Sequence, residues 1–549
     1  MNRPGPVRWV RAAAAALASV ALSPALAADA PHPGESLYRL GLLRSGAQVS
    51  ATRDAGGARI AGAAAACVNC HRRSGLGSTE GLIAIPPITG RYLFRPRAAG
   101  NERDLPYVEG MRIGRAPYSD VTLARAIREG IDAQGRPLGY LMPRYALDDA
   151  DLADLIEYLK SLDPRRLRGV TDTLLHFATI VTPEADPAKR TGMLDVLQHY
   201  FADKNTFPFP PSPPLRSSAS TAYAKSMYLA QRHWQLHVWE LTGPSHTWGA
   251  QLDRHLAEEP VMAAVSGLGG AHWAPVHEFC ERARLPCLFP NVEVPVVAGQ
   301  DFYTLYFSRG LLLEADLIRE RIEMAGAHPP RTVAQIYRSG DAGEAAARAL
   351  AAALGAHGVV VHAQAVPRSP SVQDLAAALH RVAGSDALVL WLRPADLAAL
   401  GDPAAAPPVV YVSGLMGGLE HAPLPAPWRP RAQIAFPFDL PDRSRVRLDY
   451  PLGWFSIRRI PVIAEQVQVD TYLACGVLAE TLSHMADVFV PEYLVERAEE
   501  ILEHRVLTGP YPRLTLAEGQ RFASKGGYLV KFAAAQGSQV TALAGWTVP

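Results

Sequence analysis

A five-residue run, Cys67-Val68-Asn69-Cys70-His71, combines residue types and a spacing that suggest chemistry. In the pattern C-x-x-C-H, two thiols can add to the vinyl groups of a haem, and the imidazole that follows can coordinate the iron. A redox dithiol needs a strand before the motif and a long helix after it, but here an alanine-rich stretch precedes it and residues 72–77 read RRSGLG. A zinc site needs a second cysteine or Cys/His pair at ligand spacing, and none follows. The motif therefore predicts one covalently attached haem c, with His71 as an iron ligand.

The second axial ligand can be sought by elimination. Between residues 28 and 163 the other candidates are His32, Met111 and Met142. Met142 lies in Gly139-Tyr140-Leu141-Met142-Pro143-Arg144-Tyr145, where proline stiffens the backbone and can hold a soft thioether towards a metal. Met111 has no comparable setting and is interpreted as core or loop filler. We therefore predict Met142 as the distal ligand of the iron.

The residues around these ligands suggest the elements that position them. Leu152, Leu155, Ile156 and Leu159 form an i, i+3, i+4, i+7 stripe with acids in the first turn, which predicts an amphipathic helix. The arginines from Arg72 onwards could pair with haem propionates or form a weakly basic rim, and an ordinary solvated surface is the alternative.

Taken together, residues 30–165 resemble a class I monohaem cytochrome c. The resemblance rests on Cys67 to His71, on Met142-Pro143 and on the helix from Leu152 to Leu162. It implies an all-α domain, electron transfer and a six-coordinate iron, whose Met/His ligation raises the redox potential. It also implies that the segment 85–90, IPPITG, is a stiff loop on the proximal side of the haem. A catalytic haem, as in a peroxidase, would need an open position or a second distal group. The resemblance therefore implies an electron carrier and not an enzyme.

The first 27 residues have the features of a secretory signal. A basic start leads into an apolar run from Ala12 to Leu22 and then to Ala25-Leu26-Ala27, a small-residue cleavage site. The run is shorter than the ~20 apolar residues that a membrane span needs, so we expect cleavage after Ala27 and a soluble periplasmic protein. The chain has 54 basic and 53 acidic residues, and removing Arg3, Arg8 and Arg11 leaves 51 − 53 = −2. Nucleic acid is therefore not an expected partner.

The composition changes after Asp163-Pro164, where strand-like and helix-like segments begin to alternate. One series starts with the apolar strand Leu174 to Val181, and a second starts near Asp301. Such alternation predicts an α/β fold with parallel sheets, and two series in succession predict two lobes with a cleft between them. We therefore expect a signal peptide at 1–27, a cytochrome c domain at 28–165 and a two-lobed domain at 170–549.

The second part resembles the type I periplasmic solute-binding fold, of the branched-chain amino-acid-binding kind. The resemblance rests on Val261 to Gly267, Thr332 to Tyr337 with Gly340-Asp341-Ala342-Gly343, and Asp386 to Leu392. It implies a small-molecule ligand bound between the lobes. Some members of this family are associated with periplasmic quinoprotein (PQQ) alcohol-dehydrogenase systems. The resemblance thus also suggests a periplasmic dehydrogenase, or a terminal oxidase-linked cytochrome, as redox partner.

Candidate pocket residues follow the strand ends of this fold. In Gly267-Leu268-Gly269-Gly270-Ala271-His272-Trp273, the amides of Gly269 and Gly270 could receive an anion, while His272 and Trp273 could stack on or hydrogen-bond a ligand. Ser339 and Asp341 occupy a corresponding position in the second lobe. The alternative is that the glycines form a tight turn and the tryptophan packs in the core. The hydroxyl residues typical of amino-acid binders are absent from this loop, so a conventional amino acid is not the expected ligand.

Three cysteines remain outside the haem motif. Cys280 and Cys287 could form a disulfide in an oxidising periplasm or remain buried thiols, and Cys475 is expected in the core. The sequence thus favours a periplasmic electron-transfer cytochrome fused to a solute-binding or partner-docking module. The alternative is a receptor for an ABC-type transporter or a sensor, in which the haem reports or gates ligand binding.

Overall fold

The computed structural model describes residues 32–549 apart from 54–56, 81–82, 95–115, 163–166, 207–231, 300, 327–328, 486–487, 505–508, 518 and 536. The chain forms two compact units. The first comprises residues 1–67 and 120–158, and the second comprises residues 68–119 and 159–549. The predicted signal segment, 1–27, and the alternative ligand Met111 lie outside the described residues. The predicted domain boundary at 165–170 stays a prediction.

The first unit combines short helices with a small antiparallel sheet in the order β2-β1-β5. Helix α1 packs closely against helix α5 at Gly34. A Cβ added at this glycine would lie 2.1 Å from the backbone oxygen of Asp154, so a larger residue would not fit. The rings of Tyr38 and Tyr158 pack beside this contact, 5.3 Å apart. The elements are α1 (Pro33–Leu40), β1 (Ser50–Thr52), β2 (Arg59–Ala61), η1 (Gly62–Ala65), α4 (Asp120–Glu129), β5 (Arg144–Ala146) and α5 (Asp149–Ser161), which ends beyond this unit.

The helix predicted after Met142 is present as α5, but the expectation of an all-α segment is wrong. Besides β1, β2 and β5, a hairpin of β3 (Ser78–Glu80) and β4 (Ile83–Ile85) lies in the second unit. These strands have three residues each, which is too short to give a recognisable alternation of polar and apolar side chains. Helices α2 (Val68–His71) and α3 (Gly90–Phe94) flank the hairpin in sequence. Between α2 and β3, Gly77 has a φ of +80°, and a Cβ there would meet the Ile85 oxygen at 2.1 Å.

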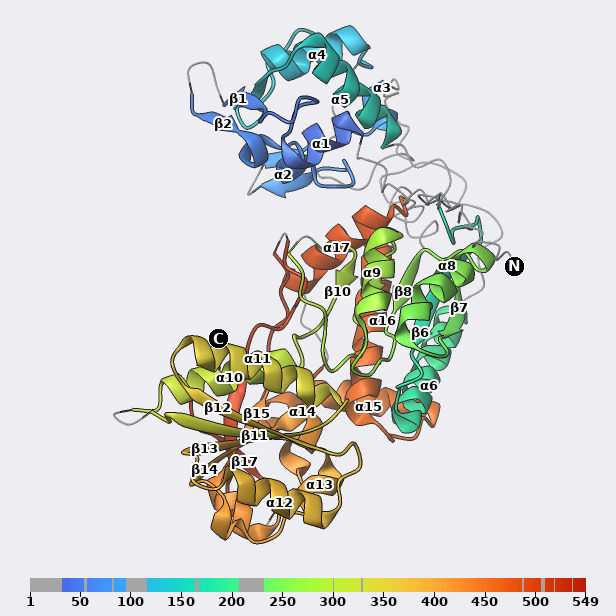
Figure 1. Ribbon diagram of the computed structural model, residues 1–549. Helices are drawn as coiled ribbons and strands as arrows, with labels where there is room; N and C mark the ends of the chain where they lie inside the picture. The colour runs from blue at the N-terminus through green and yellow to red at the C-terminus, as the bar shows by residue number, and fades with distance from the viewer. Residues whose placement is uncertain are drawn as a thin grey trace, which may run out of the picture. The chain divides into compact units, whose positions relative to one another are not determined.

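The first α/β lobe is built on a parallel sheet with strand order β10-β9-β8-β6-β7. Numbered along the lobe, this is the order 2-1-3-4-5 of a doubly wound fold. Helices α16 and α17, from the far end of the sequence, lie with this lobe (Figure 1). Its elements are β6 (Leu174–Val181), α6 (Pro187–Lys204), β7 (His233–Glu240), η3 (Ser245–Thr247), α8 (Trp248–Glu258), β8 (Ala263–Val265), α9 (Ala274–Arg282), β9 (Cys287–Leu288), β10 (Thr304–Leu305), α15 (Pro441–Arg458), α16 (Glu465–Met485) and α17 (Pro491–His504).

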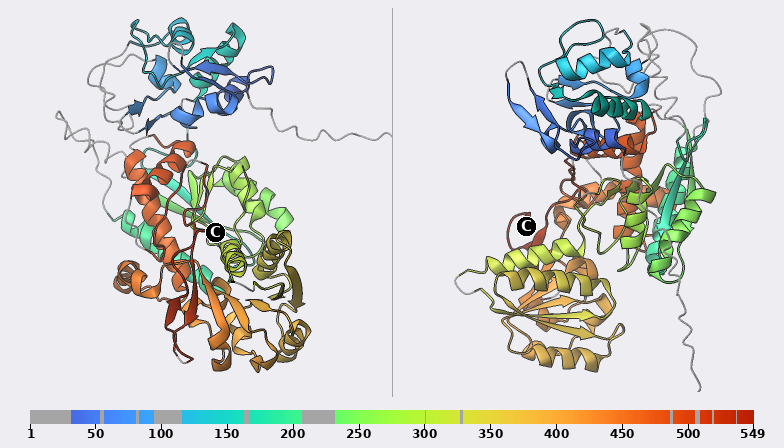
Figure 2. Two further views of the ribbon diagram at one scale, coloured as in Figure 1. Left: turned by 90° about the vertical axis from the view of Figure 1, so that its left-hand side faces the viewer. Right: turned by 45° about the horizontal axis from the view of Figure 1, so that its top comes forward.

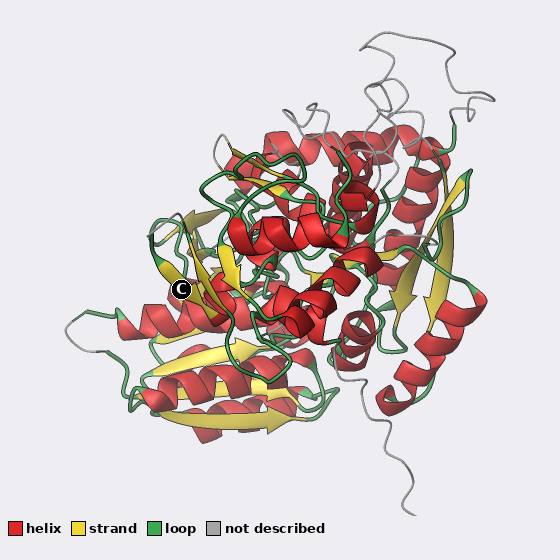
Figure 3. Ribbon diagram, turned by 90° about the horizontal axis from the view of Figure 1, so that it is seen from above, coloured by secondary structure: helices red, strands yellow, loops and turns green. Residues whose placement is uncertain are grey.

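The second lobe repeats this arrangement in the order β12-β11-β13-β14-β15, followed by antiparallel β16 and β17. Helices cover both faces of its sheet (Figures 2 and 3). Its elements are α10 (Leu311–Glu323), β11 (Thr332–Arg338), α11 (Ala342–Ala356), β12 (Val360–Val366), α12 (Val372–Val382), β13 (Ala387–Trp391), α13 (Pro394–Ala398), η4 (Pro403–Ala405), β14 (Val409–Ser413), α14 (Gly414–Gly417), η5 (Leu419–His421), η6 (Ala426–Arg431), β15 (Ala432–Phe436), β16 (Tyr528–Phe532) and β17 (Val540–Ala542). The predicted two-lobed α/β architecture is confirmed by the two strand orders.

The chain passes between the lobes at three places. It leaves the first lobe after β10 to enter α10, returns after β15 to enter α15, and crosses again between α17 and β16. The first and third crossings run side by side, since Tyr306 pairs with Phe522 and the Ser524 amide donates to the Phe307 carbonyl at 2.6 Å. Among the described helices, none is both long and apolar enough to cross a membrane.

Candidate functional site: the haem motif and the lobe cleft

The predicted haem attachment residues lie at one short helix. Cys67 directly precedes α2, and Cys70 and His71 are its last two residues. Both cysteines are partly buried, and neither is in a disulfide, so the thiols are in the oxidation state that thioether formation needs. The imidazole of His71 is only 6% exposed. The residue types and states at this helix therefore fit a covalent haem.

The orientation of His71 is set by a backbone carbonyl. Its Nδ1 lies 3.0 Å from the Pro86 oxygen. Because a carbonyl can only accept, Nδ1 carries the proton in this bond, and Nε2 is then the ring atom through which His71 would coordinate a metal. Pro86 belongs to the 85–90 loop that the sequence placed on the proximal side. The carbonyl-bonded imidazole is the arrangement that an axial ligand needs, and it adds to the fit of the site for haem.

Met142 follows a turn in which its amide donates to the Gly139 carbonyl at 3.1 Å. Its side chain is partly buried and Pro143 beside it is buried, while β5 begins at the next residue. The proline and the strand thus fix the backbone on one side of the methionine. Its role as the distal ligand stays a prediction.

Two residues that follow His71 are bonded to acids on α17, within the second unit. The Ser74 amide and hydroxyl donate to the Glu496 carboxyl at 2.9 and 2.6 Å. The Arg72 guanidinium forms an ion pair with Glu499 at 2.5 Å. Burial raises the pKa of Glu496 to about 7, against the opposing effects of Arg72 and Ser74. Arg72 therefore has a carboxylate partner within the chain, which sequence reasoning missed because the acid lies more than 400 residues away.

The predicted pocket loop in the first lobe is closely packed. A Cβ added at Gly269 would lie 2.5 Å from the Trp273 ring, and one at Gly270 would lie 2.6 Å from the Glu184 carboxylate. Trp273 is 2% exposed and belongs to the core of this lobe. His272 is bonded to Glu184 through both its amide and its Nδ1. The structure therefore favours the tight-turn and packing interpretation for Gly269, Gly270 and Trp273.

The corresponding position in the second lobe is filled by an arginine. Asp341 caps α11 and accepts two hydrogen bonds from Arg393, and Ser339 nearby is exposed. Arg393 also forms a bidentate pair with Glu293, from the first lobe, at 2.7 Å for each bond. Lys189 on α6 adds a second cation, with its Nζ 3.1 Å from a Glu293 carboxylate oxygen. Among the described residues no hydrogen bond or ion pair joins His272 to Asp341, so the predicted pocket residues form two separate groups.

The charges of this network fix its protonation states. Burial alone would raise the pKa of Glu293, but hydrogen bonds from Arg393 and the positive charges of Lys189 and Arg393 outweigh it and lower the pKa to about 2. Burial would also raise the pKa of Asp341, yet the Arg393 bonds lower it. Glu293 and Asp341 are therefore ionised at neutral pH, and their pairs with Arg393 hold the strand ends of the two lobes together.

Hydroxyl groups are present beside the first-lobe loop after all. Ser266, the residue before Gly267, lies 3.0 Å from the Thr471 hydroxyl, and the Asn291 amide donates to the Ser266 oxygen at 2.8 Å. All three side chains are largely buried. Thr471 comes from α16, about 200 residues later in the sequence, so no local pattern could reveal this group. This polar group lies where the first-lobe strands β8 and β9 end.

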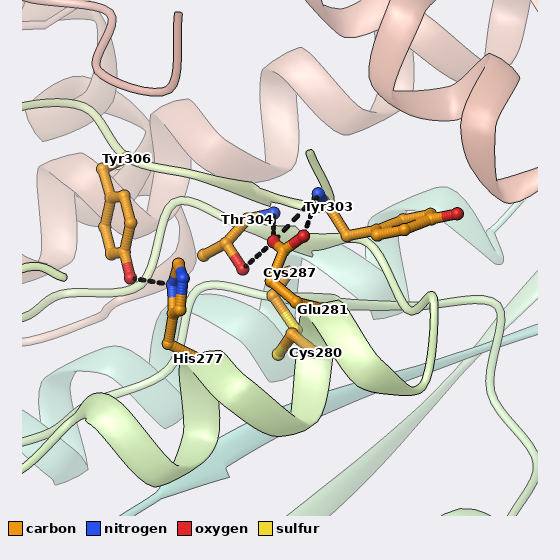
Figure 4. Close-up of a disulfide and its surroundings, with 7 residues drawn as sticks. All are labelled: His277, Cys280, Glu281, Cys287, Tyr303, Thr304 and Tyr306. Carbon is orange, nitrogen blue, oxygen red and sulfur yellow. Dashed lines mark hydrogen bonds between the residues drawn. A yellow bond between two sulfur atoms is a disulfide. The ribbon is translucent and has the colours of Figure 1, made fainter. Parts of the chain in front are cut away.

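The remaining cysteines are structural. Cys280 and Cys287 form a disulfide, which resolves the alternative that the sequence left open, and Cys475 is a fully buried thiol. Beside the disulfide, Glu281 accepts hydrogen bonds from the amides of Tyr303 and Thr304 and from the Thr304 hydroxyl (Figure 4). The Phe302 amide donates a further hydrogen bond to Glu281 at 2.8 Å. His277, Glu281 and Asp301 lie close enough for a metal. Since the Glu281 oxygens already accept these donors, its arrangement is that of a backbone clamp.

A haem-attachment motif followed by two doubly wound lobes defines a c-type cytochrome joined to a two-lobed α/β module. Residues 55–163 match the family model for cytochrome c, so this part of the chain is a cytochrome c domain, with covalently bound haem c. No curated protein sequence matches the chain.

Several solved structures of binding proteins are similar to the chain. A leucine-binding protein, LivK, from Thermotoga maritima is 12% identical and has a TM-score of 0.48, covering 67% of this chain and 98% of that one. A fatty acid ABC transporter substrate-binding protein from Thermomonospora curvata is 13% identical with a TM-score of 0.49, covering 70% and 95%. LivJ from Streptococcus pneumoniae, in complex with isoleucine, is 10% identical with a TM-score of 0.48, covering 69% and 100%. The two-lobed fold itself is established by the strand orders.

Proposed function

We propose that this protein is an exported, periplasmic electron carrier whose haem is attached to Cys67 and Cys70 and coordinated by His71 and Met142. The observation that carries the proposal is the C-x-x-C-H motif at a helix in which the Pro86 carbonyl orients His71. When bound, haem c supplies a one-electron ferric/ferrous couple that takes up an electron without making or breaking a bond. The protein's own part is to orient the imidazole, present the thioether of Met142 and exclude water from the iron.

A periplasmic quinoprotein alcohol dehydrogenase is the proposed electron donor. The export signal and the resemblance of the second part to proteins associated with such systems support this choice. The two-lobed module then docks the donor or binds a small solute. Its cleft position at Asp341 is taken by Arg393, which argues against a conventional amino acid, since a ligand ammonium there would have to displace a bidentate guanidinium.

Stopped-flow reduction tests this function directly. The purified ferric holoprotein should be reduced by a substrate-charged quinoprotein alcohol dehydrogenase at a rate that candidate solutes do not change. Failure of the dehydrogenase to reduce a protein whose haem spectrum is intact would overturn the proposed donor. Rapid peroxide turnover, or ready CO binding to the ferrous protein, would contradict a six-coordinate carrier and favour a haem enzyme.

A second candidate function is a solute receptor, serving an ABC-type transporter or a sensor, whose haem reports ligand binding. The bond between Arg72, next to His71, and Glu499 favours it, because this contact links the haem motif to the two-lobed module. Tight binding of a solute together with a change in the haem potential would support the receptor. Solute binding that leaves the potential unchanged would count against it.

A further inference from the structure

The segment that follows the haem motif, residues 72–77, contacts acids of α17 and other residues of the two-lobed part. Ser74 donates two hydrogen bonds to Glu496, and Arg72 forms its ion pair with Glu499. The guanidinium of Arg73 lies over the Phe302 ring, 4.3 Å from its centroid. Leu76 is 3% exposed and shares a hydrophobic cluster with lobe residues. The segment is thus fixed by charge, hydrogen bonds and packing together.

Glu499 is shared between two arginines. Besides Arg72, it accepts a hydrogen bond from Arg521 at 2.5 Å. The side chains of Glu499 and Arg521 are each 5% exposed, and that of Arg72 is 19% exposed. Burial raises the pKa of Glu499, and the positive charges of Arg521 and Arg72 oppose that shift. Removing one of these three buried side chains leaves an uncompensated charge on another, so a change at Arg521 alters the electrostatic balance between Glu499 and Arg72.

Arg521 lies in the third crossing between the lobes. Its Nη1 donates to the Phe302 carbonyl at 2.8 Å, and its own carbonyl accepts from the Tyr306 amide at 2.8 Å, so it is also bonded to the first crossing. Crossing segments change conformation when two lobes open or close. A change of the crossings would therefore move or reorient Arg521, and with it the charge that Glu499 presents to Arg72.

We propose that Glu499, by pairing with both Arg72 and Arg521, acts as a positioning residue that couples the opening and closing of the two lobes to the redox potential of the haem. The proposal rests on the proposed function, because it needs haem at Cys67, Cys70 and His71. It adds a route for regulation: the lobes act on the haem through one buried carboxylate. A docking partner that changes the lobe arrangement would thereby tune electron transfer.

The sign of the effect follows from electrostatics. Ferric haem carries one more positive charge than ferrous haem, so a nearby negative charge stabilises the ferric form and lowers the potential. Glu499→Gln removes a negative charge and leaves Arg72 uncompensated, and should raise the potential. Arg521→Gln leaves Glu499 less neutralised and should lower it. A merely structural role predicts no such opposition of sign.

Spectroelectrochemical titration of the full-length holoprotein measures this. The matched control is Glu500→Gln, on the same helix, whose side chain is 52% exposed and pairs with Arg497. Midpoint potentials should rise for Glu499→Gln and fall for Arg521→Gln relative to Glu500→Gln. Equal potentials in all three variants, or shifts of one sign, would overturn the proposal. Should Glu499→Gln fail to fold, Glu499→Asp retracts the carboxylate by one methylene and should shift the potential in the same direction by less.

A double-mutant cycle tests whether the lobe arrangement is coupled to the haem potential through Glu499. Glu293→Gln weakens the pair with Arg393 that joins the lobes, and small-angle scattering should show a larger radius of gyration. In the otherwise unchanged protein this variant should shift the haem potential, and in the Glu499→Gln background it should not. An equal shift in both backgrounds would refute coupling through Glu499. A protein without covalent haem in the pyridine haemochrome assay refutes the proposed function instead, so the two failures are distinguishable.

Discussion

Arg393 and Glu293 form a bidentate ion pair that joins the two lobes, with Nη1 and Nη2 of the arginine each 2.7 Å from one carboxylate oxygen. Arg393 follows β13 in the second lobe, and Glu293 follows β9 in the first. The same guanidinium bonds Asp341, one of the residues predicted to contact a ligand. The chain thus places its own cation where a solute was expected, and the lobe arrangement seen here is supported by charge within the protein.

Glu293→Gln should therefore lower the free energy of unfolding, by an amount that depends on pH. Breaking a buried ion pair on one side costs about 3–5 kcal/mol. The folded pKa of Glu293, about 2, is below its ordinary value of 4.5, so its stabilising contribution is present above pH 4.5 and is lost as pH falls towards 2. Urea unfolding at pH 7 should show a lower midpoint for the variant, and the difference should shrink at pH 3.

The exposed pair of Glu240 with Arg190 provides the control for this experiment. The Glu240 side chain is 50% exposed, and such surface pairs contribute about 0–1 kcal/mol. Glu240→Gln should leave the urea midpoint nearly unchanged at both pH values. A Glu293→Gln variant as stable as this control at pH 7 would show that the interlobe pair does not stabilise the fold.

The sequence was informative where chemistry or periodicity is local. The C-x-x-C-H motif needs only five residues, so the haem domain could be predicted from it. Each doubly wound lobe has a regular alternation of strand-like and helix-like segments, so the two lobes could be predicted as well. The three-residue strand β5 could not, because a period cannot be recognised over so short a run.

The contacts that connect these parts lie beyond any local pattern. Glu499 and Arg72 are more than 400 residues apart, and Thr471 reaches Ser266 from a helix about 200 residues later. Arg393 could be recognised as a charged residue after a strand, but its choice of Glu293 and Asp341 depends on how two lobes meet. Pairing of charges across a fold is decided by tertiary geometry, which composition and spacing do not encode.

The buried acid Glu314 provides a test in the opposite pH direction. It accepts hydrogen bonds from the Ser413 hydroxyl and the Leu415 amide, and burial raises its pKa to about 8 against these two bonds. Between its ordinary pKa of 4.5 and about 8, the unfolded chain loses this proton while the folded chain keeps it, so the wild type loses stability as pH rises. Glu314→Gln mimics the neutral acid and should become more stable than wild type at pH 8.5, by a few kcal/mol.

Urea unfolding at pH 5 and pH 8.5 measures that difference. Glu258→Gln, an exposed position at the end of α8, should follow the wild type at both values. If the stability difference between Glu314→Gln and the wild type were the same at both pH values, Glu314 would not be held neutral in the folded protein.

The Cys280–Cys287 disulfide closes a short loop with a sequence separation of 7. Closing so short a loop in the unfolded chain is worth about 2 kcal/mol. Replacing both cysteines by alanine should lower the urea midpoint accordingly and abolish the response of unfolding to added reductant. Cys475→Ala removes a thiol outside any disulfide and should keep that response. Unfolding of the wild type that is insensitive to reductant would indicate that the bridge does not stabilise the protein.

Met142→Ala tests the distal ligand. A thioether bound to ferric iron gives weak near-infrared absorption and raises the potential, so loss of Met142 should remove the band and lower the potential. Met324→Ala, at a side chain that is 61% exposed in the two-lobed part, is the control and should change neither. Covalent haem should remain in both variants, because Cys67 and Cys70 are untouched. If the Met142 variant keeps the band and the potential, the iron ligand is another methionine, and Met111 becomes the residue to replace next.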